Sequence, residues 1–369
     1  MATLILKATE ECNSNCVYCD VVRKDERGSP MSADLLELVF IRLNEFLLER
    51  QDEHIKIIWH GGEPLLLGPK YFHMVWELQE KHCRETQRRI SHDMQSNLTL
   101  FTDDYALALQ KLGIKSIGSS YDPEPHVRGP GKEVDSEHYN RMFMRAIRTV
   151  EKHGYSWGII YVVTKKSLAK PKDVFFYLTN LKLNGAINFN PVLIYDDVRQ
   201  HIAITPEEYA QFLGTIFSLW WENSHRYPNI EPFRSLTRII RDGKRDLCCA
   251  DSGNCAYGYF NITPRGQCSH CGRSGDWGLL HYGDIRDSSL EEIMADPQRG
   301  QLAERNAILE EGECNNCRFW TICHGGCPLD AYAQHGSFAH KSPWCAAKRE
   351  FIERYFEPIT GIRFDPPRE

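Results

Sequence analysis

The sequence predicts an α/β fold with a parallel sheet, followed by a smaller, cysteine-rich α+β region. In the first part of the chain, short β-rich runs alternate with longer segments of helical pattern. Six such units can be counted, and alternation of this kind favours a parallel sheet with crossover helices. The second observation is the distribution of cysteines, because ten of the 14 lie between residues 248 and 345.

The individual elements follow from these patterns. Strands are expected at 4–6, 55–59, 91–94, 116–119, 157–163 and 187–189, and helices near 33–50, 70–86, 103–112, 137–153 and 171–183. Thr205 precedes a proline and two acids, a helix N-terminus pattern, so a bridging helix is expected to about residue 223. Residues 257–263 alternate apolar and polar side chains and predict a hairpin strand with Gly266 in its turn. The expected parts are 1–204, 205–245 and 246–369.

The composition narrows the class of protein. At 369 residues the chain exceeds one comfortable core. A net charge of −6 gives no sign of a nucleic-acid partner, and no apolar run is long enough to span a bilayer. The first twelve residues show no signal peptide, so we expect a cytoplasmic protein with no membrane partner. In such a chain, 14 cysteines indicate metal or redox chemistry rather than disulfides.

The most informative motif is a Cx3Cx2C triplet formed by Cys12, Cys16 and Cys19. Three thiolates at this spacing can bind three irons of a [4Fe–4S] cluster and leave the fourth iron open to a small molecule. A structural zinc site normally needs four ligands, often as two CxxC pairs, and no second pair lies nearby.

This triplet resembles that of the radical S-adenosylmethionine (radical SAM) enzymes. The resemblance implies a partial (β/α)6 TIM-like barrel with SAM on the open iron, and a 5′-deoxyadenosyl radical that abstracts hydrogen from the substrate. It also implies that the ring of Tyr18 lies against the adenine.

Further SAM-binding positions are carried over from the same family. Gly61, Gly62 and Glu63 match the GGEP loop that receives the amino group of SAM, although Gly-Gly before Pro is also an ordinary turn. Leu98 and Pro123 occupy positions where the family has glycine. The remaining candidates resemble contacts to ribose and carboxylate but also suit simple loop capping: Gln95, Ser96, Asn97, Ser120 and Arg128.

The C-terminal cysteines resemble the SPASM domain, an extension that binds two auxiliary [4Fe–4S] clusters, which makes three clusters in all. The resemblance assigns the first auxiliary cluster to Cys249, Cys255, Cys271 and Cys327. It assigns the second to Cys314, Cys317, Cys323 and Cys345. Cys248 or Cys268 could replace Cys249 or contact the substrate, and Cys83 is expected to be a buried apolar residue. His270 and His324 lie beside ligands in the sequence and are expected to tune the clusters rather than to act as catalysts.

Radical SAM enzymes with a SPASM domain typically modify peptides or proteins. The expected function is therefore a maturase that installs a crosslink or other oxidative side-chain modification on a ribosomally made peptide. One alternative is a formylglycine maturase of the anaerobic sulfatase type, but those enzymes place an Asp base where Gly272 stands, and Asp276 comes four residues later. Two more hypotheses are modification of a small molecule such as a haem precursor, and a non-catalytic iron–sulfur or zinc scaffold.

The remaining expectations concern partners and the base. An external donor of flavodoxin or ferredoxin type would supply electrons, and a separate protein could bind a leader, because the first strand begins almost at Met1. The substrate-deprotonating residue is not readable; weak candidates are Tyr121, Asp122, Asp196, Asp197 and Asp276.

Overall fold

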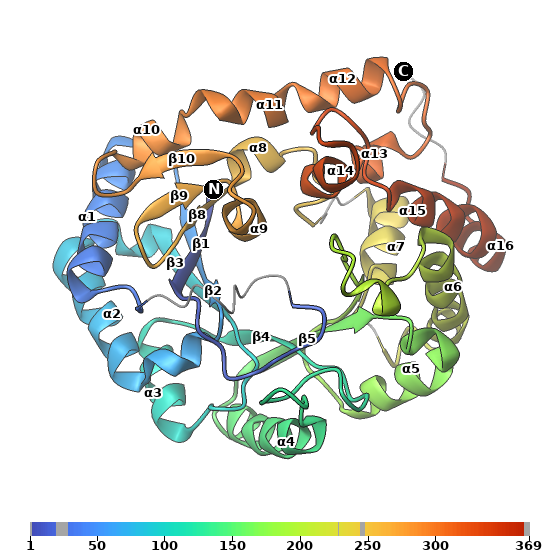
Figure 1. Cartoon of the computed structure of the whole chain (residues 1–369), viewed down its shortest axis with the longest axis horizontal. Coiled ribbons are helices and arrows are strands. Elements are labelled where there is room, and N and C mark those ends of the chain that lie inside the picture. Colours follow the sequence, from blue (N-terminus) through green and yellow to red (C-terminus); the bar gives the residue numbers. More distant parts are fainter. Residues whose placement is uncertain (1, 20–28, 228, 244–247, 365–369) are drawn as a thin grey trace. The chain divides into compact units, whose positions relative to one another are not determined.

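The structure, a computed structural model, describes residues 2–19, 29–227, 229–243 and 248–364. Its helices and strands are shown in Figure 1. The chain forms two compact units, the first made of Met1–Gly158 and Ala256–Arg299, the second of Ile159–Cys255 and Gly300–Glu369. The α/β fold class predicted from the sequence is confirmed. The three-part division at residues 204 and 245 stays a prediction.

The first unit is built on a sheet in the order β10-β9-β8-β1-β2-β3-β4. Four parallel strands come from the N-terminal segment: β1 (Ala2–Thr9), β2 (Ile55–Gly61), β3 (Ile90–Gln95) and β4 (Ser116–Ser120). The other three come from the C-terminal half: β8 (Tyr259–Ile262), β9 (Gln267–Ser269) and β10 (His281–Asp284). Strand β8 pairs with β1 in parallel, which places this cysteine-rich segment beside the strand that leads to the Cx3Cx2C loop.

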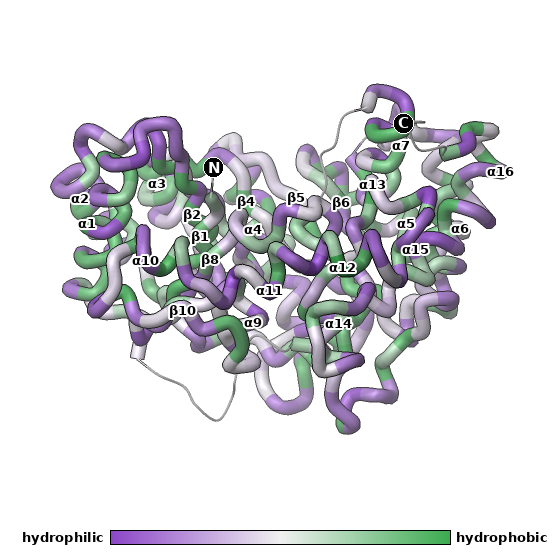
Figure 2. Tube along the Cα trace, turned by 90° about the horizontal axis from the view of Figure 1, so that it is seen from above, coloured by the Kyte–Doolittle hydropathy of each residue, from purple (hydrophilic) through white to green (hydrophobic). Residues whose placement is uncertain are grey.

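Helices α1 (Ala33–Glu49), α2 (Pro69–His82), α3 (Asp103–Lys111) and α4 (Ser136–Lys152) connect the parallel strands, and each packs against the next. Figure 1 shows them in a row along the outside of the strands. Figure 2 shows that the trace of α1 changes between hydrophobic and hydrophilic residues, as expected for a helix that packs on a sheet with one face, while β1 is largely hydrophobic. Shorter helices are α8 (Cys255–Gly258), α9 (Gly272–Asp276), α10 (Leu290–Met294) and the 3₁₀ turns Pro64–Leu67, Gln87–Arg89 and Pro297–Arg299.

The second unit contains most of strand β5 (Ser156–Val163), with β6 (Ile187–Pro191) and β7 (Ile230–Glu231) parallel to it. Its longer helices are α5 (Pro171–Asn180), α6 (Pro206–Glu222) and α7 (Phe233–Asp242), with 3₁₀ turns at Ser167–Ala169 and Gln200–Ile202. The C-terminal part adds α11 (Gly300–Ala303), α12 (Arg305–Glu311), α13 (Trp320–Cys323), α14 (Pro328–His335), α15 (Cys345–Phe351), a π-helical turn (Ile352–Phe356) and α16 (Glu357–Thr360). Aromatic rings of α6, α7 and α15 form its core, with Phe217 against both Phe233 and Phe351.

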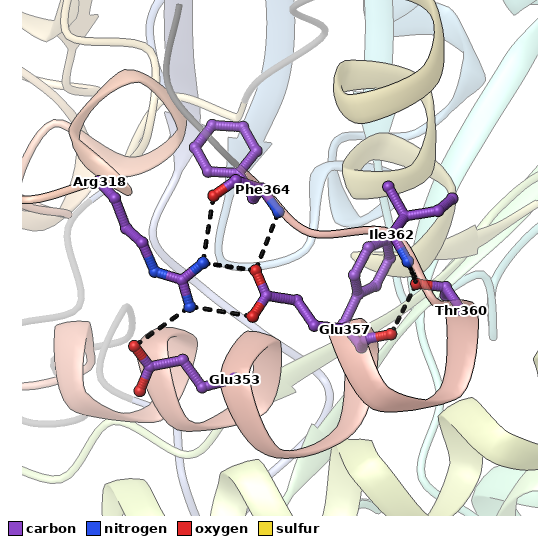
Figure 3. Close-up of polar contacts among 7 residues, drawn as sticks. Arg318, Glu353, Glu357, Thr360, Ile362 and Phe364 are labelled. Carbon is purple, nitrogen blue, oxygen red and sulfur yellow. Dashed lines mark hydrogen bonds and ion pairs between the residues drawn. The ribbon is translucent and has the colours of Figure 1, made fainter.

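The end of the described chain is fixed by Arg318 (Figure 3). Its guanidinium group donates two hydrogen bonds to the carboxylate of Glu357, at 2.5 and 2.9 Å, and one to the carbonyl of Phe364 at 3.1 Å. Glu357 in turn accepts the amide of Phe364 at 2.9 Å, and Glu353 lies 3.3 Å from the guanidinium. Arg318 follows Cys317 directly, so this network joins a cysteine-bearing loop to the C-terminal helix.

The expected elements agree with the structure. All six predicted strands and the five helices between them are present, and α6 begins with the capping box of Thr205 and Glu208. The predicted hairpin is formed by β8 and β9, with Gly266 at a φ of 85° in the turn. Its parallel pairing with β1 was not predicted. Among the described residues there is no helix with the length and apolar character needed to cross a membrane.

Candidate active site and cluster-binding residues

The Cx3Cx2C loop follows β1 and is attached to a second loop of the first unit. The amide of Asn15 donates to the carbonyl of Gly129 at 2.6 Å, and that of Val17 to the carbonyl of Val127 at 3.0 Å. All three cysteines are partly exposed. Burial raises the pKa of Cys12 to about 12 and that of Cys16 to about 11, so a free thiolate is disfavoured unless a cation compensates it.

The GGEP loop lies against the backbone that carries this triplet. The amide of Gly62 donates to the carbonyl of Thr9 at 2.9 Å, and that of Glu63 to the carbonyl of Glu11 at 2.7 Å. A Cβ atom on Gly61 would come within 2.3 Å of the Thr9 oxygen, and one on Gly62 within 2.0 Å of the Glu11 oxygen. Both glycines are therefore required by a close approach of two backbones, which is more than a simple turn would need.

Glu63 joins this loop to the segment after β3. Its carboxylate is 1% exposed and accepts hydrogen bonds from the amide of Leu65, the hydroxyl of Ser96 and the amide of Asn97. Burial raises the pKa of Glu63, and these three donors oppose that rise. Asn97 continues the connection, because its side-chain amide donates to Asn13 of the cysteine loop at 2.7 Å.

Leu98, at a position where glycine was expected, has a left-handed backbone conformation that residues other than glycine rarely adopt. Its φ is 63° and its side chain is fully buried. The backbone geometry that suits glycine is thus kept here by a leucine, and the buried side chain compensates for the strain.

A second polar cluster holds Tyr18, which was expected to contact adenine. The Tyr18 hydroxyl donates to the carboxylate of Asp122 and accepts from Arg128. Arg128 also donates to Asp122 at 3.1 Å, and its guanidinium lies 5.5 Å from the ring centre of Tyr139. Arg128 is 5% exposed and Asp122 1%, so both serve at least to fix the cysteine loop. Their contact with SAM stays a prediction.

The other candidates of the first unit are placed as follows. Gln95 donates to the hydroxyl of Ser120 at 3.5 Å. Tyr121 is fully buried and stacks on Phe143 with ring centres 4.3 Å apart, the setting of a core residue. Cys83 is fully buried as expected and donates to the carbonyl of Phe40.

A buried ion pair lies beside Gly272. The ammonium of Lys7, on β1, is 2.6 Å from a carboxylate oxygen of Asp276 and 3.0 Å from the carbonyl of Gly272. The two side chains are 1% and 9% exposed. A Cβ atom on Gly272 would lie 3.2 Å from Cε of Lys7, so Lys7 fills the space next to this glycine. His60, paired with Lys7 across β1 and β2, is neutral, because burial and then Lys7 lower its pKa to about 4.

In the second unit, Cys249 and Cys255 line a small hollow that is partly open to solvent. Arg305, His324 and Pro328 line it as well. Pro328 follows Cys327, the N-cap of α14. Cys248 does not line the hollow, and its thiol donates to Asp251 at 3.5 Å.

The four cysteines predicted for the second auxiliary cluster are also in the second unit. Burial, together with the nearby thiols of Cys345 and Cys317, raises the pKa of Cys314 to about 11. Burial likewise raises the pKa of Cys323 to about 11, again with a contribution from Cys345. These thiols are therefore close enough to repel one another as thiolates, the situation that bound iron would relieve.

No group of three or more His, Cys, Asp or Glu side chains in the described residues is arranged around one metal ion. A cubane has a different requirement, because each thiolate binds its own iron and the sulfur atoms stand farther apart. Cys271, the N-cap of α9, lies in the first unit, and the buried Cys268 donates to the carbonyl of Gly266.

The sequence did not identify two charged residues that lie close to the predicted ligands and base, Lys7 and Arg305. Lys7 is the charged residue of a strand rich in apolar side chains, a signal that the sequence does contain. Arg305 begins a polar helix and has no comparable signal.

Comparison with known proteins supports the fold and the class of site. The sequence model of the Radical SAM superfamily matches residues 6–178. A cysteine-type anaerobic sulfatase-maturating enzyme of Clostridium perfringens is 24% identical over 98% of both chains. A serine-type enzyme of Bacteroides thetaiotaomicron is also 24% identical, over 88% of this chain and 81% of its own.

Solved structures give the same result for the fold. The structure of anSMEcpe with bound AdoMet matches with a TM-score of 0.83 and 23% identity, over 98% of this chain and 99% of that one. Streptococcus suis SuiB bound to precursor peptide SuiA matches with a TM-score of 0.61 and 14% identity, over 93% of this chain and 75% of that one.

Proposed function

Because residues 6–178 match the sequence model of the Radical SAM superfamily, we propose that this chain is a maturase that oxidises a cysteine or serine side chain of a protein or peptide to an aldehyde. One observation carries this proposal. The match to a sulfatase-maturating enzyme covers 98% of both chains, so it includes the Cx3Cx2C loop and the C-terminal cysteines together. The crosslinking function expected from the sequence is less well supported, because relatives that match over most of the chain are named sulfatase-maturating enzymes.

The residues of the first unit fit a [4Fe–4S] cluster and SAM. Cys12, Cys16 and Cys19 would bind the cluster, and the close approach at Gly61 and Gly62 leaves room there for no side chain. When bound, the cluster and SAM would supply the radical that removes a hydrogen atom from the substrate. The chain's contribution is to hold the loops in place through Glu63 and to exclude water from the reacting side chain.

The residues of the second unit fit auxiliary clusters. The thiols of Cys314, Cys317, Cys323 and Cys345 interact with one another, which supports their assignment to one cluster. That Cys249 lines the same hollow as Cys255, and Cys248 does not, favours Cys249 as a ligand. The assignment of Cys271 and Cys327 to the same cluster, and the total of three clusters, are part of this proposal.

Asp276 is a candidate for the base that is missing at Gly272. The sulfatase maturases are expected to have an acidic base directly after the cysteine matching Cys271. Here Lys7 occupies the space beside Gly272 and holds the carboxylate of Asp276 next to it. We propose that Asp276 accepts the proton of the substrate hydroxyl or thiol. The hydrogen atom on carbon would leave to the SAM-derived radical and the remaining electron would pass to an auxiliary cluster. With a cysteine substrate, hydrolysis of the resulting thioaldehyde would give the aldehyde and release sulfide.

Partners and location complete the proposal. A relative, anSMEcpe, has been solved with AdoMet and the Kp18Cys peptide, which supports a peptide or protein substrate here. An electron donor of flavodoxin or ferredoxin type, a separate leader-binding protein and a cytoplasmic location are proposed from the sequence alone.

The test is an anaerobic assay of the reconstituted protein with dithionite, SAM and peptides that carry cysteine or serine in a sulfatase-type sequence. We expect 5′-deoxyadenosine together with a peptide aldehyde that a hydrazide reagent labels. Cys16→Ala, which removes one cluster ligand, is the matched control and should yield neither product. Oxidised peptide without hydrazide labelling would instead indicate a crosslink.

A further inference from the structure

Arg305 is a buried cation among the cysteines of the second unit. Its side chain is 4% exposed, and it lies at the start of α12, on the wall of the hollow that Cys249 and Cys255 also line. Burying a guanidinium group is costly unless its hydrogen-bond donors are satisfied and a negative charge lies nearby. The donors of Arg305 have partners, but these partners are neutral.

Four backbone carbonyls hold the guanidinium. Its nitrogens donate to the oxygens of His324 and Gly325, both at 3.0 Å, of Phe338 at 2.8 Å and of His340 at 2.9 Å. These residues belong to the segment 323–345 that carries three predicted cluster ligands. A planar guanidinium group that donates to four carbonyls has little freedom to move, so its positive charge is fixed in position.

The backbone around Arg305 is shaped to admit it. Gly325 has a φ of 74°, and a Cβ atom there would lie 3.2 Å from one guanidinium nitrogen and 2.4 Å from Cδ1 of Leu309. Any side chain at this position would displace Arg305 or Leu309.

The groups near Arg305 that would carry negative charge as cluster ligands are cysteines. Burial lowers its pKa, and the cysteines that oppose this effect are Cys327, Cys255, Cys314 and Cys323. Cys327 and Cys255 come from the ligand set predicted for the first auxiliary cluster, and Cys314 and Cys323 from the second. No carboxylate is among its hydrogen-bond partners in the described residues.

We propose that Arg305 is a positioning residue that raises the reduction potential of the auxiliary iron–sulfur centres, by holding a permanent positive charge between their two ligand sets. A cluster with thiolate ligands becomes more negative on reduction, and a fixed cation in a low-dielectric interior stabilises the more negative state. The potential would then be set by charge, and the carbonyl contacts would fix the place from which the charge acts. This inference rests on the proposed auxiliary clusters.

The experiment is a redox titration followed by electron paramagnetic resonance on full-length, reconstituted protein, with iron content measured on the same samples. Arg305→Gln should keep the iron content and lower the midpoint potential of an auxiliary signal, whereas Arg305→Lys, which keeps the charge, should stay close to the wild-type value. Arg354→Gln is the matched control, because it removes the same charge from an exposed ion pair with Glu350. It should leave the potentials unchanged.

The outcomes separate this inference from the proposed function. Wild-type protein with only about four iron atoms would contradict the auxiliary clusters themselves. Unchanged potentials in an iron-loaded Arg305→Gln variant would overturn the role of Arg305 alone. If Arg305→Gln loses iron, Arg305→Lys decides: retained clusters at the wild-type potential support the charge, and equal loss of iron shows a purely structural role.

Discussion

Lys7 on the first strand and Asp276 in helix α9, 269 positions apart in the sequence, form a buried ion pair with an N–O distance of 2.6 Å. The pair lies beside Gly272 and follows from the parallel pairing of β8 with β1, which brings the C-terminal segment to the strand that leads to the cysteine loop. It therefore places a carboxylate in the same unit as the proposed SAM site.

We expect Asp276→Asn to abolish formation of the oxidised peptide while SAM cleavage continues. The amide cannot accept a proton from the substrate, but the cysteine loop and Gly61–Glu63 are untouched. Because the ammonium of Lys7 then stays buried without its carboxylate, the free energy of unfolding should also fall, by about 3–5 kcal/mol. Product and 5′-deoxyadenosine are measured by mass spectrometry, and stability by denaturant unfolding.

The double variant Lys7→Met/Asp276→Asn separates the two effects. Replacing both partners of a buried pair removes the unpaired charge, so stability should recover in large part. Activity should not recover, since the proton acceptor is still missing. A double variant that regained peptide oxidation would show that Asp276 acts only through the fold.

Gly62→Ala should prevent assembly of the cluster on the Cx3Cx2C loop. The added Cβ atom would lie 2.0 Å from the carbonyl oxygen of Glu11, a contact that only a backbone shift can relieve. Iron content should fall by about four atoms per chain. Gly300→Ala is the matched control, because its Cβ atom would meet only the end of the Glu304 side chain, at 3.9 Å. Wild-type iron in Gly62→Ala would contradict the proposed role of this approach.

Leu98→Gly should destabilise the protein although it restores the residue expected at this position. Relief of the left-handed backbone at a φ of 63° gains about 1–2 kcal/mol, but loss of a fully buried leucine side chain costs about 2–5 kcal/mol. The second effect is larger, so we expect a net loss of about 1–3 kcal/mol in urea unfolding. A more stable glycine variant would mean that backbone strain dominates at this site.

The sequence predicted the parts of this protein whose signals are local. The six strands and their helices follow from apolar runs and helix caps, such as Thr205 with Glu208, and the hairpin follows from Gly266. The pairing of β8 with β1 was not predictable, because the sequence of neither strand indicates which strand it pairs with. For the same reason the pattern could show Lys7 as a charge in an apolar strand, but not Asp276 as its partner.

The candidate site likewise has one part that the sequence predicted and one part that it did not. The spacing of Cys12, Cys16 and Cys19 identified the loop, and the departure at Leu98 was visible in the sequence. The connecting role of Glu63 and the placement of Arg305 depend on backbone groups from loops far apart in the chain, which a residue pattern does not encode.

Arg318→Ala should release the C-terminal end of the described chain from helix α16. Arg318 supplies both hydrogen bonds to the carboxylate of Glu357 and one to the carbonyl of Phe364, as Figure 3 shows. Without them the amide of Phe364 should exchange hydrogen faster and the end of the chain should be cut sooner by protease. Arg354→Gln is the control, because Arg354 lies just before Glu357 in the chain but outside this network. This variant should match the wild type.

The same network should depend on pH in a defined direction. Burial raises the pKa of Glu357, but Arg318 and the amide of Phe364 outweigh it, so the pKa in the folded protein is below the ordinary value. A carboxyl whose folded pKa is lowered contributes stability that is fully present above its unfolded pKa of about 4.3 and is lost as pH falls through the folded value. Protection of the Phe364 amide should therefore persist at neutral pH and disappear in acid in the wild type. In Glu357→Gln this acid-dependent loss should be absent, and an unchanged profile would show that Glu357 is not the titrating group.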